Sequence, residues 1–98
     1  IVACFGLAFK ADIDDLRESP ALEITRKISE WHKGEVWVVE PYISDLPDVL
    51  KGRVKLKTLE EAINQSTVKI LLVDHKIFKE VIADKNENII DTRGIWSS

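Results

Sequence analysis

Residues 1–20 read IVACFGLAFKADIDDLRESP, and this opening segment settles the architecture of the chain. Its first five residues form a continuous apolar run, which is typical of a strand covered on both faces of a parallel sheet. Ser19 can then cap a helix, and Pro20 suits the first helical turn. The segment therefore predicts a buried strand, a long connection and a crossover helix.

The rest of the chain continues this alternation of strands and helices. In the first helix, Ala21, Ile24, Ile28 and Trp31 recur at helical spacing before Gly34 ends it. Further strands are predicted at 36–39, 54–56, 68–73 and 88–91, and further helices at 58–64 and 76–82. The pattern predicts a Rossmann-like three-layer α/β domain, with a mostly parallel sheet and helices on both faces.

Composition favours one domain that acts in water. The 98 residues are 45% apolar and 32% charged, with a formal net charge of −3, so neither nucleic acid nor a membrane is an expected partner. Residues 1–98 hold no apolar run near the roughly 20 residues that cross a bilayer and no signal-peptide pattern, so we expect a cytoplasmic location. Cys4 is expected to be a buried, unreactive thiol. The chain lacks methionine and begins inside a strand, which indicates a segment of a longer polypeptide.

Charged residues gather in the connection after the first strand. In a parallel sheet, ligands bind where strands end, so this connection is a candidate site for a phosphate-bearing ligand. Lys10 could bind a phosphate or a sugar oxygen, or lie solvated at the surface. Arg17 could bind a phosphate or carboxylate, or pair with an acidic neighbour. Asp12, Asp14 and Asp15 lack the turn glycine and terminal glutamate of a calcium loop, so no metal site is predicted.

Two further strand ends carry polar residues. Asp91-Thr92-Arg93-Gly94 places a carboxylate and a guanidinium after the last strand, where they could bind a ligand or form an ion pair with each other. His75 follows the run 68–73, and it suits either a binding site or a structural hydrogen bond. Both segments are expected at the same sheet edge as the first connection.

A dinucleotide-binding interpretation fits only part of the sequence. Gly6 follows a strand, and Glu40 ends the second strand, where an acid would bind a ribose. However, positions 8 and 11 are Ala8 and Ala11 rather than glycines, and the connection is long before its helix begins. A self-contained NAD site is therefore not expected.

Several motifs together resemble the carboxyl-terminal domain of the UDP-glucose/GDP-mannose dehydrogenase family. The motifs are GLAFK at 6–10, DDLRESP at 14–20 and DTRG at 91–94, and the likeness covers essentially the whole chain. Residues 31–35, 39–41 and 72–75 look most like the members that oxidise UDP-N-acetyl-D-mannosamine.

The resemblance implies a function and a set of site residues. Enzymes of this family use NAD and a catalytic cysteine to oxidise the C6 hydroxyl of a nucleotide sugar to a carboxylate, for surface polysaccharide synthesis. It implies that residues 1–98 bind the UDP-sugar, whereas NAD is bound mainly by an amino-terminal domain. By matched position, Phe9 and Lys10 would contact the nucleotide sugar, Arg93 its nucleotide or diphosphate end, and Arg17 the NAD.

The resemblance also implies what this segment lacks. Cys4 does not occupy the family's glycine-rich motif around the catalytic cysteine, so the segment is expected to be inactive alone, and the full-length enzyme is expected to be a homo-oligomer. An alternative from another class is a non-catalytic regulatory or assembly module that uses Trp37 or Trp96 at an interface.

Overall fold

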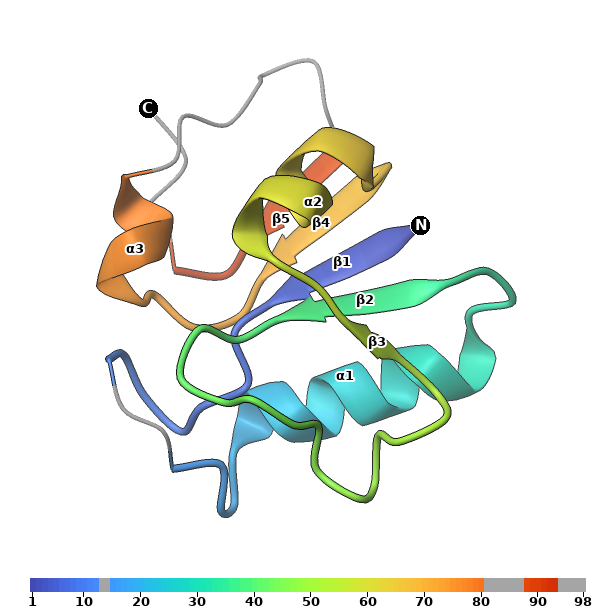
Figure 1. The fold of residues 1–98 in the computed structure, drawn as a ribbon, viewed down its shortest axis with the longest axis horizontal. Helices are drawn as coiled ribbons and strands as arrows, with labels where there is room; N and C mark the ends of the chain where they lie inside the picture. Colours follow the sequence, from blue (N-terminus) through green and yellow to red (C-terminus); the bar gives the residue numbers. More distant parts are fainter. Residues whose placement is uncertain (13–14, 81–87, 94–98) are drawn as a thin grey trace.

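The computed structural model describes residues 1–12, 15–80 and 88–93. The elements in chain order are β1 (Val2–Phe5), α1 (Pro20–Trp31), β2 (Val36–Val39), β3 (Lys55–Leu56), α2 (Leu59–Gln65), β4 (Val68–Leu71), α3 (Lys76–Lys79) and β5 (Asn88–Asp91). The strands of this described part form one parallel sheet in the order β3-β2-β1-β4-β5 (Figure 1). The predicted fold class is confirmed.

The apolar run at the start of the chain forms the centre of the sheet. All four residues of β1 are buried, and Val2 pairs with Val36 on one side and with Val68 on the other. Because side chains alternate along a strand, Cys4 faces one layer and Phe5 the other. Burial raises the pKa of the Cys4 thiol to about 11, so this cysteine is an unreactive core residue, as predicted.

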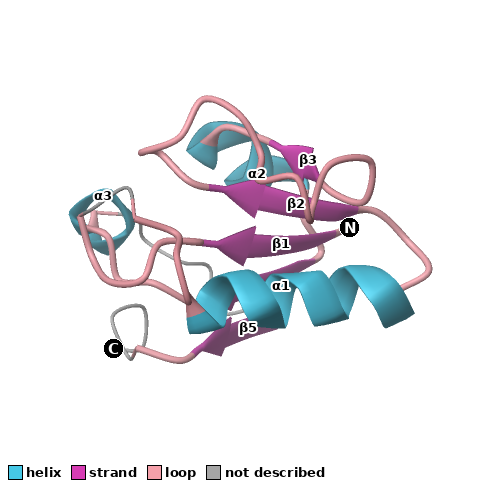
Figure 2. Ribbon diagram, turned by 90° about the horizontal axis from the view of Figure 1, so that it is seen from below, coloured by secondary structure: helices cyan, strands magenta, loops and turns pink. Residues whose placement is uncertain are grey.

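Helices cover both faces of the sheet (Figure 2). Ala21 and Ile28 of α1 pack in the same core cluster as Cys4. Ala62 of α2 and Phe78 of α3 pack on the other face. The three layers follow from this division, since each face of the buried sheet must be covered by an apolar helix surface.

The first helix begins as predicted but buries a different stripe. The Ser19 hydroxyl accepts a hydrogen bond from the Leu22 amide, and α1 ends at Trp31, three residues before Gly34. The expected apolar face was wrong in part, because Ile24 is 41% exposed and Trp31 70% exposed. Thr25 is buried in their place. The helix has more apolar residues than the sheet can cover, and burial is decided by the geometry of the sheet.

The remaining elements follow the predictions with shifted boundaries. Thr58 caps α2 in a capping box with Glu61. The strand predicted at 68–73 ends at Leu71, because Leu72 and Val73 leave the ladder while their amides still bond to the Phe5 carbonyl. The helix predicted at 76–82 is a single turn in the described residues, and positions 81 and 82 lie outside them.

All the strands point the same way, so their carboxyl ends form one edge of the sheet. The connection after β1, the segment from Glu40 after β2, the β4–α3 connection that carries His75, and the residues after β5 begin at this edge (Figure 1). The segments that carry Phe9, Lys10 and Arg93 therefore all leave the sheet at this edge.

Candidate functional site

The connection after β1 turns sharply away from the sheet at Gly6. Its φ angle is +103°, and an added Cβ would lie 2.5 Å from the Cβ of Val73. Leu7 and Ala8 continue into the interior, whereas Phe9 is 50% exposed and Lys10 is exposed. The connection thus has a buried base and an exposed tip that presents an aromatic ring and an ammonium group.

Glu40 anchors the base of this connection. Its side chain is buried, and its Oε1 accepts hydrogen bonds from the amides of Leu7 at 2.9 Å and Ala8 at 3.0 Å. Its Oε2 accepts a bond from the Tyr42 amide at 3.1 Å. Burial alone would raise the pKa of Glu40, but hydrogen bonds from His75 and from the amides of Leu7 and Tyr42 outweigh it and hold the pKa below its ordinary value.

This arrangement explains why a dinucleotide interpretation fails. In a dinucleotide fold, backbone amides after the first strand bind the pyrophosphate, and the acid after the second strand binds the ribose. Here the carboxylate of Glu40 instead satisfies the amides of Leu7 and Ala8. Those two amides are therefore not free to bind a phosphate, and the acid is not free to bind a ribose.

His75 makes structural hydrogen bonds, which is one of the two roles that its position in the sequence suggested. The imidazole is fully buried, with Nε2 2.8 Å from Glu40 Oε1 and Nδ1 2.8 Å from the Asp12 amide nitrogen. The sequence indicated Glu40 and His75 separately, as polar residues at strand ends, but it did not predict the hydrogen bond between them. Their pairing could not be recognised because 35 residues separate them.

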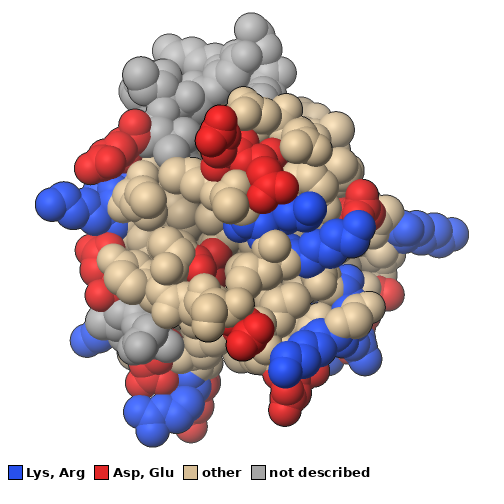
Figure 3. All heavy atoms as spheres, in the orientation of Figure 1, with Lys and Arg blue, Asp and Glu red and all other residues tan. Residues whose placement is uncertain are grey.

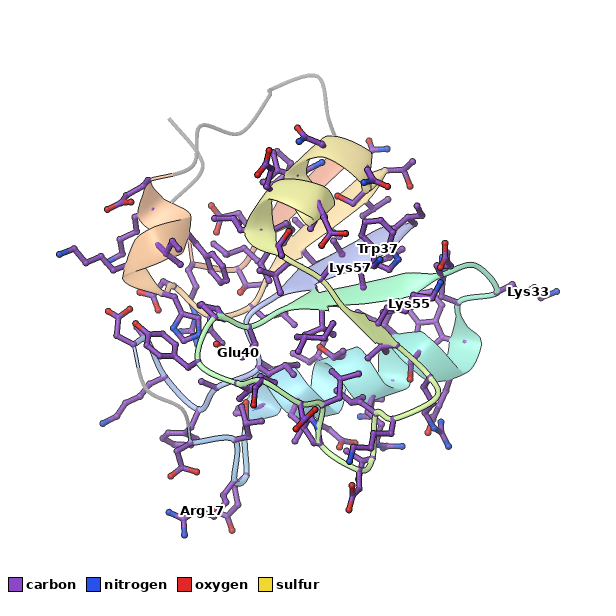
Figure 4. The ribbon with its side chains drawn as sticks, in the orientation of Figure 1. Arg17, Lys33, Trp37, Glu40, Lys55 and Lys57 are labelled. Atoms are coloured by element: carbon purple, nitrogen blue, oxygen red, sulfur yellow. The ribbon has the colours of Figure 1, made fainter. Side chains whose placement is uncertain are left out.

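Arg17 lies later in the connection after β1, beyond the tip formed by Phe9 and Lys10. Its side chain points away from the sheet (Figure 4). Its side chain is 89% exposed and forms a two-pronged ion pair with Asp15, at 3.1 Å from Nε and 3.0 Å from Nη2. Hydrogen bonds from Arg17 lower the pKa of Asp15 to about 2. The structure therefore separates Arg17 from the base of the connection. Arg17 pairs with an acidic neighbour, Asp15, which is one of the two roles that the sequence suggested.

The residues after β5 return toward the middle of the sheet. The Thr92 hydroxyl donates to the Leu71 carbonyl at 2.7 Å, and Arg93 Nε donates to the Leu72 carbonyl at 3.3 Å. The Arg93 amide donates to Asp91 Oδ1 at 2.9 Å. The Nε bond holds the guanidinium group of Arg93 beside the end of β4, whereas Gly94 of the same motif lies outside the described residues.

Lys10 and Arg93 therefore share one edge of the sheet. They follow β1 and β5, which lie on either side of β4. Adjacent strands are about 4.8 Å apart, so the ends of β1 and β5 are about 10 Å apart.

Two of the cavities lie beside the connections that leave this edge. One, of about 390 Å³, is lined by Phe9, Asp15, Arg17 and Glu18. The other, of about 410 Å³, lies between the end of β2 and the helices α2 and α3, and neither Lys10 nor Arg93 lines it. The predicted substrate residue Phe9 thus borders the first cavity, together with the predicted cofactor residue Arg17.

Charge is mixed over the visible surface. Figure 3 shows Lys and Arg side chains interspersed with Asp and Glu side chains. Lys57 lies over the Trp37 ring, 4.8 Å from its centroid, so this tryptophan is a core residue with its ring face covered.

The part of the chain that the structure describes has neither a metal-binding cluster nor a membrane-spanning helix. Residues 1–12, 15–80 and 88–93 contain no cluster of three or more His, Cys, Asp or Glu side chains that could hold a metal ion. In the same ranges, no helix has both the length and the apolar character needed to cross a bilayer.

Comparison with known proteins identifies relatives over the whole chain. Residues 3–98 match the domain described as "UDP-glucose/GDP-mannose dehydrogenase family, UDP binding domain". A UDP-N-acetyl-D-mannosamine dehydrogenase of Yersinia pestis is 54% identical over 97 residues, covering 97% of this chain and 23% of that protein. An NDP-N-acetyl-D-galactosaminuronic acid dehydrogenase of Ralstonia solanacearum is 49% identical over 100 residues, covering 100% of this chain and 23% of that protein.

A solved structure agrees with these sequence matches. The UDP-N-acetyl-mannosamine dehydrogenase from S. aureus superposes with a TM-score of 0.74 at 30% identity, over 99% of this chain and 23% of that one. The chain thus spans about a quarter of the length of the relatives it matches.

Proposed function

The chain belongs to the UDP-glucose/GDP-mannose dehydrogenase family, and from this premise we propose that residues 1–98 bind the UDP-sugar within a longer NAD-dependent dehydrogenase. The reaction is oxidation of the sugar C6 hydroxyl to a carboxylate. The 54% identity to the Yersinia pestis protein favours UDP-N-acetyl-D-mannosamine as the substrate, and surface polysaccharide synthesis as the use of the product. The comparisons do not favour a non-catalytic module.

The position of two cations at one sheet edge carries this proposal. Lys10 is exposed at the tip of the connection after β1, and Arg93 is held over the end of β4 by its Nε bond to Leu72. We assign Arg93 to the nucleotide or diphosphate end of the ligand, and Phe9 and Lys10 to the nucleotide sugar. Because Glu40 already accepts from the amides of Leu7 and Ala8, we assign the neutralisation of the phosphate charge to the side-chain cations.

The remaining parts of the active site belong to other segments of the proposed enzyme. The single cysteine, Cys4, is buried and its pKa is raised, so it cannot act as the nucleophile. The catalytic cysteine and most of the NAD site would come from outside residues 1–98, and this segment alone would be inactive. The exposed Arg17 would contact NAD after exchanging its Asp15 partner. We place the enzyme in the cytoplasm, as a homo-oligomer.

Replacing either cation is expected to weaken UDP binding by the full-length protein. Lys10→Ala and Arg93→Ala should each raise the dissociation constant about 10- to 100-fold, since a hydrogen bond to a charged group contributes about 1.5 to 3 kcal/mol. Isothermal titration calorimetry with UDP would measure this effect.

A lysine far from this edge provides the control for the titration. Lys33 lies at the opposite end of the sheet, near the start of β2 (Figure 4), so Lys33→Ala should bind UDP as the wild type does. Equal affinities for the wild type and for the Lys10 and Arg93 variants would remove both residues from the site.

A further inference from the structure

The buried imidazole of His75 has one defined protonation form. A backbone N–H can only donate a hydrogen bond, so His75 Nδ1, at 2.8 Å from the Asp12 amide nitrogen, must be an acceptor. The ring proton is therefore on Nε2, which donates to Glu40 Oε1 at 2.8 Å. The ring thus joins a backbone amide of the first connection to a carboxylate at the end of β2.

Both ends of this link are themselves fixed. Glu40 is held by the amides of Leu7 and Ala8 in the base of the connection. Asp12 has a left-handed backbone, with φ of 59°, and its Oδ1 accepts bonds from the Lys76 amide at 2.8 Å and the Tyr42 hydroxyl at 3.1 Å. The connection is therefore attached to the protein both before and after its exposed tip.

Only three residues lie between the two attachment points. They are Phe9, Lys10 and Ala11, and the first two are exposed. A segment this short has little conformational freedom when both of its ends are held. Its side chains are therefore presented in a narrow range of positions, which lowers the entropy that a ligand must remove on binding.

We propose that His75 is a positioning residue for the UDP-sugar site, acting through the Asp12 amide to hold Phe9 and Lys10 ready for the ligand. This inference rests on the proposed function. His75 itself is buried beneath the connection and does not touch the ligand. Its contribution is to orient the tip, while Glu40 fixes the tautomer that makes Nδ1 an acceptor.

Substitution of His75 by asparagine or by glutamine tests the hydrogen bonds of the two ring nitrogens one at a time. In His75→Asn, the side-chain oxygen can take the place of Nδ1 and accept from Asp12, but nothing donates to Glu40. In His75→Gln, the longer amide can donate to Glu40 in place of Nε2, but the acceptor for Asp12 is lost. The first variant keeps the proposed positioning contact and the second removes it.

UDP binding by the full-length protein would test the role of His75. We expect His75→Asn to bind UDP within about 3-fold of the wild type and His75→Gln to bind about 10-fold more weakly, by calorimetry. A merely structural role predicts the opposite order, because asparagine leaves the larger cavity at a buried position. Equal affinities, or weaker binding by His75→Asn, would overturn the inference.

Two parallel measurements separate this inference from the proposed function. If Lys10→Ala weakens UDP binding while the two His75 variants bind alike, the UDP site stands and the role of His75 is wrong. If Lys10→Ala and Arg93→Ala both bind UDP as the wild type does, both proposals fail. Amide hydrogen exchange in the wild type needs no variant: the Asp12 amide should exchange at least 10-fold more slowly than the Lys10 amide, and equal rates would contradict the His75 bond.

Discussion

Glu40→Ala is expected to lower the free energy of unfolding by about 3 to 5 kcal/mol, because it leaves several buried donors without an acceptor and each such donor costs about 1 to 3 kcal/mol. The backbone amides of Leu7, Ala8 and Tyr42 and the ring of His75 would lose their acceptor together. A domain of this size is stabilised by only about 5 to 15 kcal/mol in total, so the loss is severe. Denaturant unfolding followed by tryptophan fluorescence would measure it.

Two comparisons make this prediction specific. Glu60→Ala, at an exposed position in the first turn of α2, should cost less than about 1 kcal/mol. Because folding lowers the pKa of Glu40, its ionised form stabilises the fold above its unfolded pKa, and this stability is lost as pH falls through the folded pKa. The difference between the wild type and Glu40→Gln should therefore shrink in acid. A Glu40→Ala variant with the same free energy of unfolding as Glu60→Ala would contradict the account.

Gly6→Ala is expected to destabilise the domain by about 3 kcal/mol or more, for two separate reasons. The φ angle of +103° is one that residues with a Cβ rarely adopt, which costs about 1 to 2 kcal/mol. The new Cβ would also lie 2.5 Å from the Cβ of Val73, a core atom with little room to move, and such overpacking costs about 1 to 3 kcal/mol. Thermal unfolding would measure the loss.

Gly52 offers a matched control for the steric part of this effect. Its φ angle is also positive, at +80°, but an added Cβ would meet no atom within 4 Å. Gly52→Ala should therefore cost only the conformational part, about 1 to 2 kcal/mol. Equal losses at the two positions would show that contact with Val73 has no part in the requirement for Gly6.

Local signals predicted most of the fold. The continuous apolar runs at 1–5 and 36–39 became β1 and β2, because a strand buried on both faces needs apolar residues at every position. Ser19 and Thr58 marked the starts of α1 and α2 because side-chain capping is a local interaction. These features are determined by neighbours in the sequence, so the sequence alone was sufficient.

Features that depend on distant residues were not predicted. The helical repeat of α1 suggested that Trp31 packs in the core, but the sheet does not reach it. The bonds of His75 to Glu40 and Asp12 cross 35 and 63 residues, and only the folded sheet brings these segments together. By contrast, the sequence did predict one sheet edge for the segments of Lys10 and Arg93, and only the strand order, with β4 between β1 and β5, required the structure.

The role of Glu40 distinguishes the first connection from a dinucleotide-binding site. The carboxylate of Glu40, which follows β2, accepts hydrogen bonds from the amides of Leu7 and Ala8. In a dinucleotide-binding site a phosphate would accept the corresponding bonds. The internal anion leaves the tip of the connection, with Phe9 and Lys10, as the exposed part that can meet a ligand.

The crystal structure of the full-length protein with UDP would test the proposed site most directly. We predict that the diphosphate lies at the carboxyl edge of the sheet, between the segment of Phe9 and Lys10 and the guanidinium of Arg93. UDP bound instead in the cavity beside α2, with Lys10 and Arg93 both left in solvent, would contradict the account.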